Sequence, residues 1–224
     1  LLNRYFPGSY EMTPSGVDPV EPAQDSDGPL RIAFSDREEK GALRLFLRGL
    51  RRLPADLDWT ATIFSDEPGE LDFRVSKTIR DRIKVIGPDQ VSLAELLSVS
   101  HVYCATSTGP RPASAVLRQA MAAGAVPVAS TIGRYTELVG DGQRGMLFPT
   151  GDPVTLAGQI TRLGNDPALL AKLKKAATGT DLVKDWDSIV DEIEGLYGRI
   201  ASRRHVIKRN PAIVKKLAGR PLID

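Results

Sequence analysis

Short apolar runs alternate with helical stretches along most of this 224-residue chain, and this alternation limits the folds open to it. The apolar runs have the length of buried strands, and the stretches between them carry apolar residues at helical spacing. Strands are predicted at residues 30–34, 59–64, 83–86, 101–105, 126–129 and 145–148, and helices at 41–53, 75–82, 92–99, 113–123, 154–163, 167–177 and 186–200. Such regular alternation implies right-handed crossovers between parallel strands. We therefore predict an α/β fold, a doubly wound parallel sheet of about six strands with a helical C-terminal segment.

Composition narrows the classes of function. A hydrophobic content of 42% and a formal net charge of +2 indicate an ordinary folded domain, neither disordered nor a general polyanion binder. The single cysteine, Cys104, excludes an internal disulfide and agrees with a reducing compartment, so a cytoplasmic location is expected. No apolar run approaches the roughly 20 residues that a membrane-spanning helix needs.

Ligands of open parallel sheets bind beyond the carboxyl ends of the strands, and the first such segment here is SDREEKG, residues 35–41. Its cations, Arg37 and Lys40, stand beside a predicted helix start, where they and the free N–H groups would neutralise a diphosphate. Glu38 and Glu39 lie between them in the sequence. These seven residues alone favour the alternative, a solvated and salt-bridged turn.

The second segment, ATSTGPRPAS at residues 105–114, is a loop of small residues that lets a ligand approach the backbone closely. Pro112 suits the first turn of the helix predicted after it. Arg111 lies just before that helix, where the helix dipole disfavours a cation, and a bound anion would remove the penalty. The alternative is that Arg111 points into water. Gln119 stands one position off the apolar stripe of the helix, near the rim of the expected site.

A third segment, residues 130–145, contains a predicted short helix with Tyr135 and a tight turn, for which a structural role is expected. The sequence predicts no metal site and no cofactor, because its two histidines are far apart and no metal-ligand, catalytic-triad or glycine-rich phosphate motif is present. Residues 199–220 hold eight Lys and Arg and no acid, but no interleaved aromatics, so nucleic acid is not expected. The apolar Ile213, Val214 and Leu217 stand beside the basic Lys215 and Lys216, an amphipathic pattern that suggests peripheral membrane contact or, alternatively, a solvated linker.

Several blocks in a fixed order carry a resemblance to a known family. They are MTPSGVD at 12–18, LRIAFSDREEKGALRLFLRGL at 30–50, HVYCATSTGP at 101–110, QAMAAGAVPVAS at 119–130, ELVGDGQRGMLF at 137–148, and DW at 185–186. From about residue 10 to residue 197 the chain resembles the C-terminal, donor-binding half of a GT-B fold retaining glycosyltransferase of family four, also called group 1. It is similar to the actinobacterial phosphatidylinositol mannosyltransferases.

In that family a nucleotide diphosphate sugar lies between two Rossmann-like halves. Arg37 and Lys40 resemble the Arg and Lys that bind the diphosphate, although Asp36 stands where the family has glycine. The two glutamates of the family's helix motif, which contact the sugar and the ribose, correspond to Arg111 and Gln119. The nucleotide-sugar-binding residues implied are Arg37, Lys40, Ser107, Gly109, Arg111, Ser114 and Gln119, with no catalytic residue and no metal ligand.

The two exchanges have unequal chemical consequences. Gln119 still hydrogen-bonds a ribose, but more weakly than a carboxylate does. The guanidinium of Arg111 is a donor only, so it accepts nothing from sugar hydroxyls and would instead hold a phosphate or an acidic sugar.

The resemblance also implies a domain plan. It comprises a lead-in strand and loop at 1–29, a Rossmann-like nucleotide-sugar-binding domain at 30–198, and a basic tail or linker at 199–224. The abrupt ends suggest a piece of a longer chain with a missing N-terminal Rossmann-like domain. RPLID at 220–224 resembles a junction that precedes a metal-dependent phosphoesterase domain in actinobacterial chains.

Three functions remain open at this point. The first is the donor-binding half of a glycosyltransferase that transfers a hexose from a GDP- or UDP-hexose. This half alone is expected to be inactive, since the family's acceptor site and catalytic histidine lie in the other half. The second is a degenerate, non-catalytic binding or scaffolding module within a larger multidomain protein. The third is the same fold adapted to an anionic ligand anchored by Arg111.

Overall fold

The structure, a computed structural model, describes residues 10, 13, 15–18, 28–70 and 75–209, without the side chains of residues 40, 70 and 202–209. Its contacts divide the chain into two compact units, one formed by Val17–Lys184 and the other by Leu1–Gly16 with Asp185–Asp224. The boundary at residue 185 lies inside the predicted domain 30–198. The predicted lead-in strand and loop at 1–29 lie largely outside the described residues. The apolar-basic stretch 213–217 and the RPLID segment lie wholly outside them.

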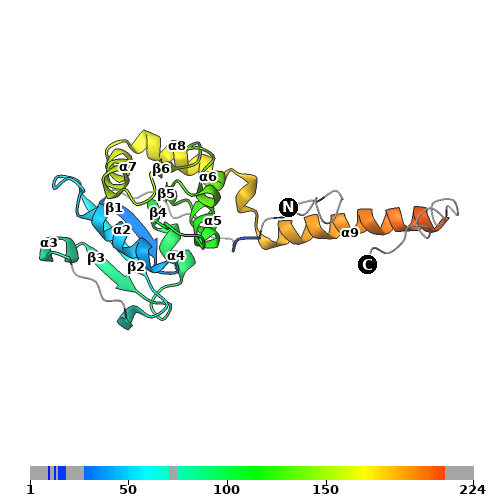
Figure 1. The fold of residues 1–224 in the computed structure, drawn as a ribbon, viewed down its shortest axis with the longest axis horizontal. Helices are drawn as coiled ribbons and strands as arrows, with labels where there is room; N and C mark the ends of the chain where they lie inside the picture. The colour runs from blue at the N-terminus through cyan, green and yellow to red at the C-terminus, as the bar shows by residue number, and fades with distance from the viewer. Residues whose placement is uncertain (1–9, 11–12, 14, 19–27, 71–74, 210–224) are drawn as a thin grey trace, which may run out of the picture. The chain divides into compact units, whose positions relative to one another are not determined.

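The larger unit is built on one parallel sheet of six strands in the order β3-β2-β1-β4-β5-β6 (Figure 1). The strands are β1 Leu30–Ser35, β2 Trp59–Phe64, β3 Ile83–Ile86, β4 Val102–Ala105, β5 Val126–Ser130 and β6 Met146–Phe148. β1 is central and pairs with β2 on one side, Leu30 opposite Trp59, and with β4 on the other, Ile32 opposite Val102. The predicted fold class and all six predicted strands are confirmed. The central strands could be recognised because strands covered on both faces are continuous apolar runs.

Helices cover both faces of this sheet (Figure 1). They are α2 Lys40–Leu50, α3 Lys77–Arg80, α4 Leu93–Ser98, α5 Ser114–Ala122, α6 Gly133–Val139, α7 Pro153–Asn165 and α8 Pro167–Thr178, with short 3₁₀ turns at Pro68–Glu70 and Asp181–Val183. One buried cluster packs α2 and α7 against the sheet, around Phe34 and Phe46, whose rings stack at 4.8 Å. The other cluster packs α4, α5 and α6 against the opposite face, around Tyr103 and Leu117.

Local capping signals explain where several helices begin. Ser92 and Glu95 form a capping box at the start of α4, which satisfies the backbone N–H groups of both residues. Asp152 and Asp166 accept backbone N–H bonds at the starts of α7 and α8. The prediction for Pro112 was wrong in detail, because α5 begins at Ser114 and Pro112 lies before its N-cap residue.

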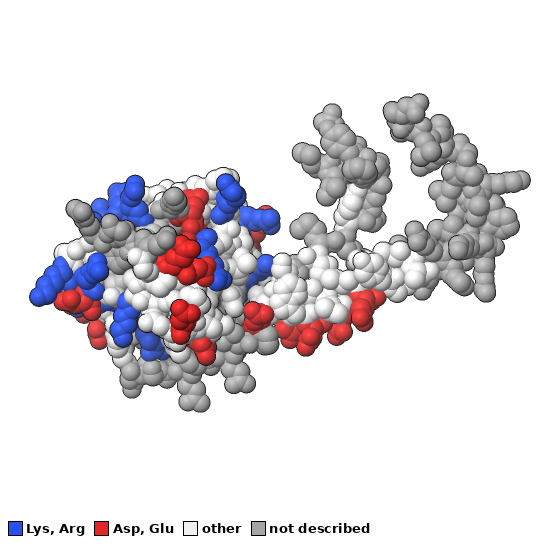
Figure 2. Space-filling view, turned by 90° about the horizontal axis from the view of Figure 1, so that it is seen from below, with Lys and Arg blue, Asp and Glu red and all other residues white. Residues whose placement is uncertain are grey.

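The smaller unit contains α9, Trp186–Arg209, which is longer than the predicted helix at 186–200. Figure 2 shows acidic side chains along one side of this helix. The acidic residues of α9 are Asp187, Asp191, Glu192 and Glu194. Apolar side chains on the same helix are exposed, among them Trp186 and Tyr197. No helix within the described residues is both long and apolar enough to cross a bilayer.

Candidate functional site at the carboxyl edge of the sheet

The site expected from topology lies where β1 and β4 pair although they are not consecutive in the chain. In a doubly wound sheet this reversal of strand order opens a crevice beyond the carboxyl ends of the two strands. β1 ends at Ser35 and β4 at Ala105, so the segments that follow, 36–40 and 106–113, lie at the carboxyl edge of the sheet at this point. Both were predicted to lie at this edge.

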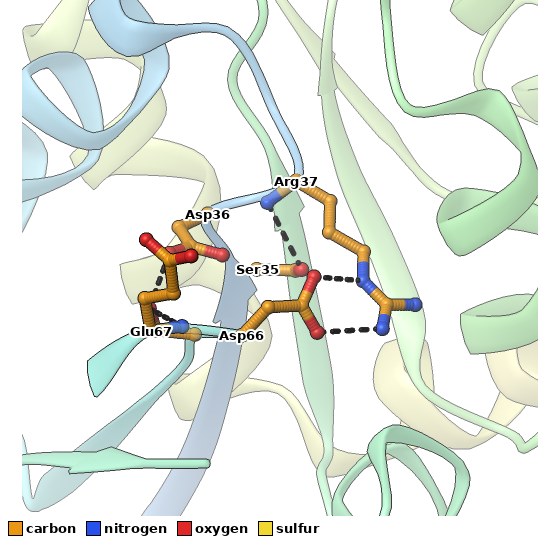
Figure 3. Close-up of polar contacts among 6 residues, drawn as sticks. Ser35, Asp36, Arg37, Asp66 and Glu67 are labelled. Atoms are coloured by element: carbon orange, nitrogen blue, oxygen red, sulfur yellow. Dashed lines mark hydrogen bonds and ion pairs between the residues drawn. The ribbon is translucent and has the colours of Figure 1, made fainter. Parts of the chain in front are cut away.

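Arg37 pairs with an acid from a neighbouring strand end, not with the acids beside it in the sequence. Its Nη2 and Nε donate to the two carboxylate oxygens of Asp66 at 2.8 and 2.9 Å, as Figure 3 shows. Asp66 follows β2, and the two side chains are 45% and 51% exposed. The hydrogen bond from Arg37 lowers the pKa of Asp66, and the same pair raises the pKa of Arg37. The Arg37 charge is therefore already balanced.

Glu38 is buried, so the expectation of a solvated turn was wrong for this residue. The Tyr135 hydroxyl donates to one carboxylate oxygen at 2.5 Å, and the Ala113 N–H lies 3.5 Å from the other. Desolvation raises the pKa of Glu38 to about 7, although these two hydrogen bonds act in the opposite direction. The hydroxyl of Tyr103, also buried, has no hydrogen-bond partner among the described residues. Glu38 thus joins the end of β1 to α6 and to the N-cap of α5.

Glu39 reaches in another direction, into the loop after β4. Its carboxylate accepts the Thr108 N–H and the Thr108 hydroxyl, both at 2.6 Å. Desolvation raises the pKa of Glu39, but hydrogen bonds from Thr108, Ser107 and Gly109 outweigh it and leave the pKa below its ordinary value. The donors that line this loop are therefore directed at a carboxylate of the same chain.

The loop after β4 is held in place from two sides. The Thr106 hydroxyl donates to the Ala42 carbonyl of α2 at 2.8 Å, and the Ser130 hydroxyl donates to the Ser107 carbonyl at 2.5 Å. Thr106, Ser107 and Ser130 are all fully buried. These two bonds anchor the loop at Thr106 and Ser107, directly before the N–H groups of Thr108 and Gly109.

The remaining predicted residues lie around this loop with fewer contacts. Arg111 is exposed, and within the described residues its side chain forms no hydrogen bond or ion pair, in line with the alternative that it points into water. Ser114 is the first residue of α5, and Gln119 lies on the same helix, both half-buried. Lys40 begins α2, and its side chain is outside the described residues. Whether these residues bind a nucleotide sugar stays a prediction.

Two of the residues that dominate this edge, Glu38 and Glu39, were interpreted from sequence only as solvated neighbours of the cations. The sequence did hold one indication of their contacts. Two acids follow one buried strand, and a Thr-Gly loop that follows another strand was expected at the same edge of the sheet. Within the part of the chain that the structure describes, no group of three or more His, Cys, Asp or Glu side chains is arranged to hold a metal ion.

A cavity of about 440 Å³ lies at the opposite edge of the sheet. Its lining includes Leu30, Asp58, His101 and Gly124, which stand at or just before the amino ends of β1, β2, β4 and β5. Ligand sites of doubly wound sheets form at the carboxyl ends, so size alone does not make this cavity the functional site.

The strand order and its reversal between β1 and β4 define a Rossmann-like domain of the kind found in GT-B glycosyltransferases. The family described as "Glycosyl transferases group 1" matches residues 31–166, and the chain belongs to this family. A phosphatidyl-myo-inositol mannosyltransferase of Mycobacterium leprae is 30% identical over 125 residues, which cover 54% of this chain and 33% of the relative. An exopolysaccharide phosphotransferase of Streptomyces coelicolor is 28% identical over 194 residues, 85% of this chain and 20% of the relative.

A solved structure of Anabaena HepE in complex with UDP and glucose is similar with a TM-score of 0.63 and 22% identity, covering 77% of this chain and 49% of that one. This likeness shows the fold. The chain spans at most about a third of the length of the two curated relatives described above.

Proposed function

We propose that this chain is the donor-binding half of a group 1 glycosyltransferase and binds the diphosphate of a nucleotide-activated hexose beside β1 and β4. The observation that carries the proposal is the fixed set of donors at Ser107, Thr108 and Gly109 at the topological switch point. Backbone N–H groups and hydroxyls directed at one anionic group are the usual means of holding phosphate in such folds. The complex of HepE with UDP and glucose supports the same ligand class.

Catalysis by such a half would consist of positioning the donor and stabilising the leaving diphosphate. Arg37 and Lys40 are the cations proposed for that charge. Arg37 would exchange its present partner, Asp66, for a phosphate oxygen. Turnover is not expected from this half alone, because the acceptor site and the catalytic histidine belong to the other half of the fold.

Two observations favour the second candidate, a non-catalytic module. The Arg37 charge is paired with Asp66, and a carboxylate of the chain already accepts the donors of the loop. Arg111 and Gln119 add to this, since neither supplies the carboxylate that the family directs at the donor.

Calorimetry of the chain with UDP, GDP and their hexose derivatives separates these candidates. The proposal expects nucleotide binding that Arg37→Ala and Lys40→Ala each abolish. Arg48→Ala serves as the matched control, because it removes an equal charge from an exposed position further along α2. Absence of binding to every nucleotide at millimolar concentration would leave the non-catalytic module, and sugar-independent binding lost only in Arg111→Ala would indicate an adapted anion site.

A further inference from the structure

The carboxylate of Glu39 is bound within its own chain in the way that a protein binds a ligand. Both the N–H and the hydroxyl of Thr108 donate to it at 2.6 Å. The Ser107 hydroxyl and the Gly109 N–H also lower the pKa of Glu39, and the Gly109 N–H is 3.5 Å from the Ser107 hydroxyl oxygen, to which it donates. These donors belong to three consecutive residues of one loop, 69 residues along the chain from Glu39. A carboxylate on the protein surface has no need of such a set, since water satisfies it.

Gly109 makes this close approach sterically feasible. A Cβ atom placed on Gly109 would lie 1.8 Å from one carboxylate oxygen of Glu39 and 2.7 Å from its carboxyl carbon. Any larger residue would therefore expel the carboxylate or shift the loop. Glycine at such a position allows an anion to contact the backbone directly.

The same donors suit a phosphate group. Consecutive backbone N–H groups and hydroxyls that converge on one point bind phosphate oxygens and carboxylate oxygens alike. The point lies at the end of β4 beside β1, where a doubly wound sheet receives its ligand. Because Thr106 and Ser130 fix the loop, the donors stay in place when the carboxylate leaves.

We propose that the Glu39 carboxylate is an internal anion that fills the phosphate subsite formed by Ser107, Thr108 and Gly109 and must withdraw before a ligand phosphate binds. This inference rests on the proposed function and adds its regulation. Only the fraction of molecules with an empty subsite is competent to bind, so the apparent affinity falls in proportion to that fraction. Removal of the carboxylate should therefore tighten phosphate binding about ten-fold or more.

The test uses inorganic pyrophosphate, which carries the phosphate groups without base or sugar, and calorimetry on the 224-residue chain. Glu39→Gln keeps the shape of the side chain and removes its charge, and Glu39→Ala empties the subsite. Glu137→Gln is the matched control, since it removes an equal charge from an exposed position on α6. Amide spectra of the variants confirm that the fold is kept and that only the signals of the loop, including Thr108 and Gly109, move.

We expect both Glu39 variants to bind pyrophosphate at least ten-fold more tightly than the unaltered chain, and Glu137→Gln to stay within two-fold of it. Equal affinities of Glu39→Gln and Glu137→Gln would overturn the inference. If nucleotides still bind in an Arg37-dependent manner in that case, the proposed function survives without it. Tighter pyrophosphate binding by the Glu39 variants, with no nucleotide bound by any variant, would support the internal anion and refute the nucleotide-sugar function. No binding of either probe by any variant would overturn both.

Discussion

We expect Glu38→Gln to remove a pH dependence of folding stability that the unaltered chain shows between about pH 4.5 and pH 7. Burial holds the pKa of Glu38 near 7 in the folded chain, against an ordinary value of 4.5. Between these values the folded chain binds more protons than the unfolded chain, so its stability falls as the pH rises. One such proton changes the free energy of unfolding by at most about 1.4 kcal/mol per pH unit, or about 3 kcal/mol over the interval.

Glutamine has the shape of the protonated acid and does not ionise, so it isolates this contribution. The measurement is urea-induced unfolding between pH 5 and pH 8.5, followed by the fluorescence of Trp59, which is buried. The difference in stability between the unaltered chain and Glu38→Gln should grow with pH in favour of the variant and level off above pH 7. When Tyr135→Phe is introduced into both chains, this stability difference should continue to grow to higher pH. The hydrogen bond from Tyr135 lowers the pKa of Glu38, so its removal raises that pKa further.

Parallel stability curves for the unaltered chain and Glu38→Gln across this range would refute the reasoning. Parallel curves would mean that the Glu38 carboxyl group is solvated and has an ordinary pKa. It would then not be buried against Tyr135 and Ala113 in solution.

Three further substitutions test the packing and the charge pairs. Gly49→Ala should lower the free energy of unfolding by about 1 kcal/mol, because the added Cβ would lie 2.6 Å from Leu156. Such overpacking costs about 1–3 kcal/mol, which exceeds the gain of about 1 kcal/mol in helix propensity. An unchanged urea midpoint would contradict this prediction. Tyr103→Phe should raise stability by about 1 kcal/mol, since it removes a buried hydroxyl without a partner among the described residues, and a loss would reveal a partner. Asp66→Asn should change stability by less than about 1 kcal/mol, because its ion pair with Arg37 is exposed, while it tightens pyrophosphate binding in calorimetry; weaker binding would show that Asp66 orients Arg37.

The sheet could be predicted from the sequence because its signals are local. The strands β4 and β5 are covered on both faces and are buried along their whole length. The strands at 59–64 and 83–86 lie nearer the edge and include the exposed Thr60 and Lys84, but they too were predicted with the bounds that the structure has. Helix ends were less accurate. α2 ends at Leu50 and not at residue 53, because the residues that follow continue the apolar spacing but form a turn.

The edge of the sheet that carries the site could also be predicted, since it follows from strand order. The hydrogen-bond and ion-pair partners of its charged residues could not be predicted from the sequence. Arg37 pairs across 29 residues, Glu39 across 69 and Glu38 across 97, whereas the sequence only shows that the three stand together. Charged residues that are adjacent in a loop need not pair with one another, because each side chain contacts the strand end or helix that lies nearest to it in space.

The loop conformation and the side chains that would select a ligand depend on different groups of this chain, the first largely on the backbone and the second on side chains such as Arg111. The donors at Thr108 and Gly109 include backbone N–H groups, fixed through Thr106 and Ser130, and they persist whatever side chains surround them. An arginine at position 111 changes the charge near a sugar but leaves these donors untouched. Under the proposed function, phosphate binding and sugar selection would therefore depend on different atoms. Under our proposal the loop keeps its capacity to hold an anion although positions 111 and 119 carry no carboxylate, and Glu39 is the anion that occupies it in the absence of a ligand.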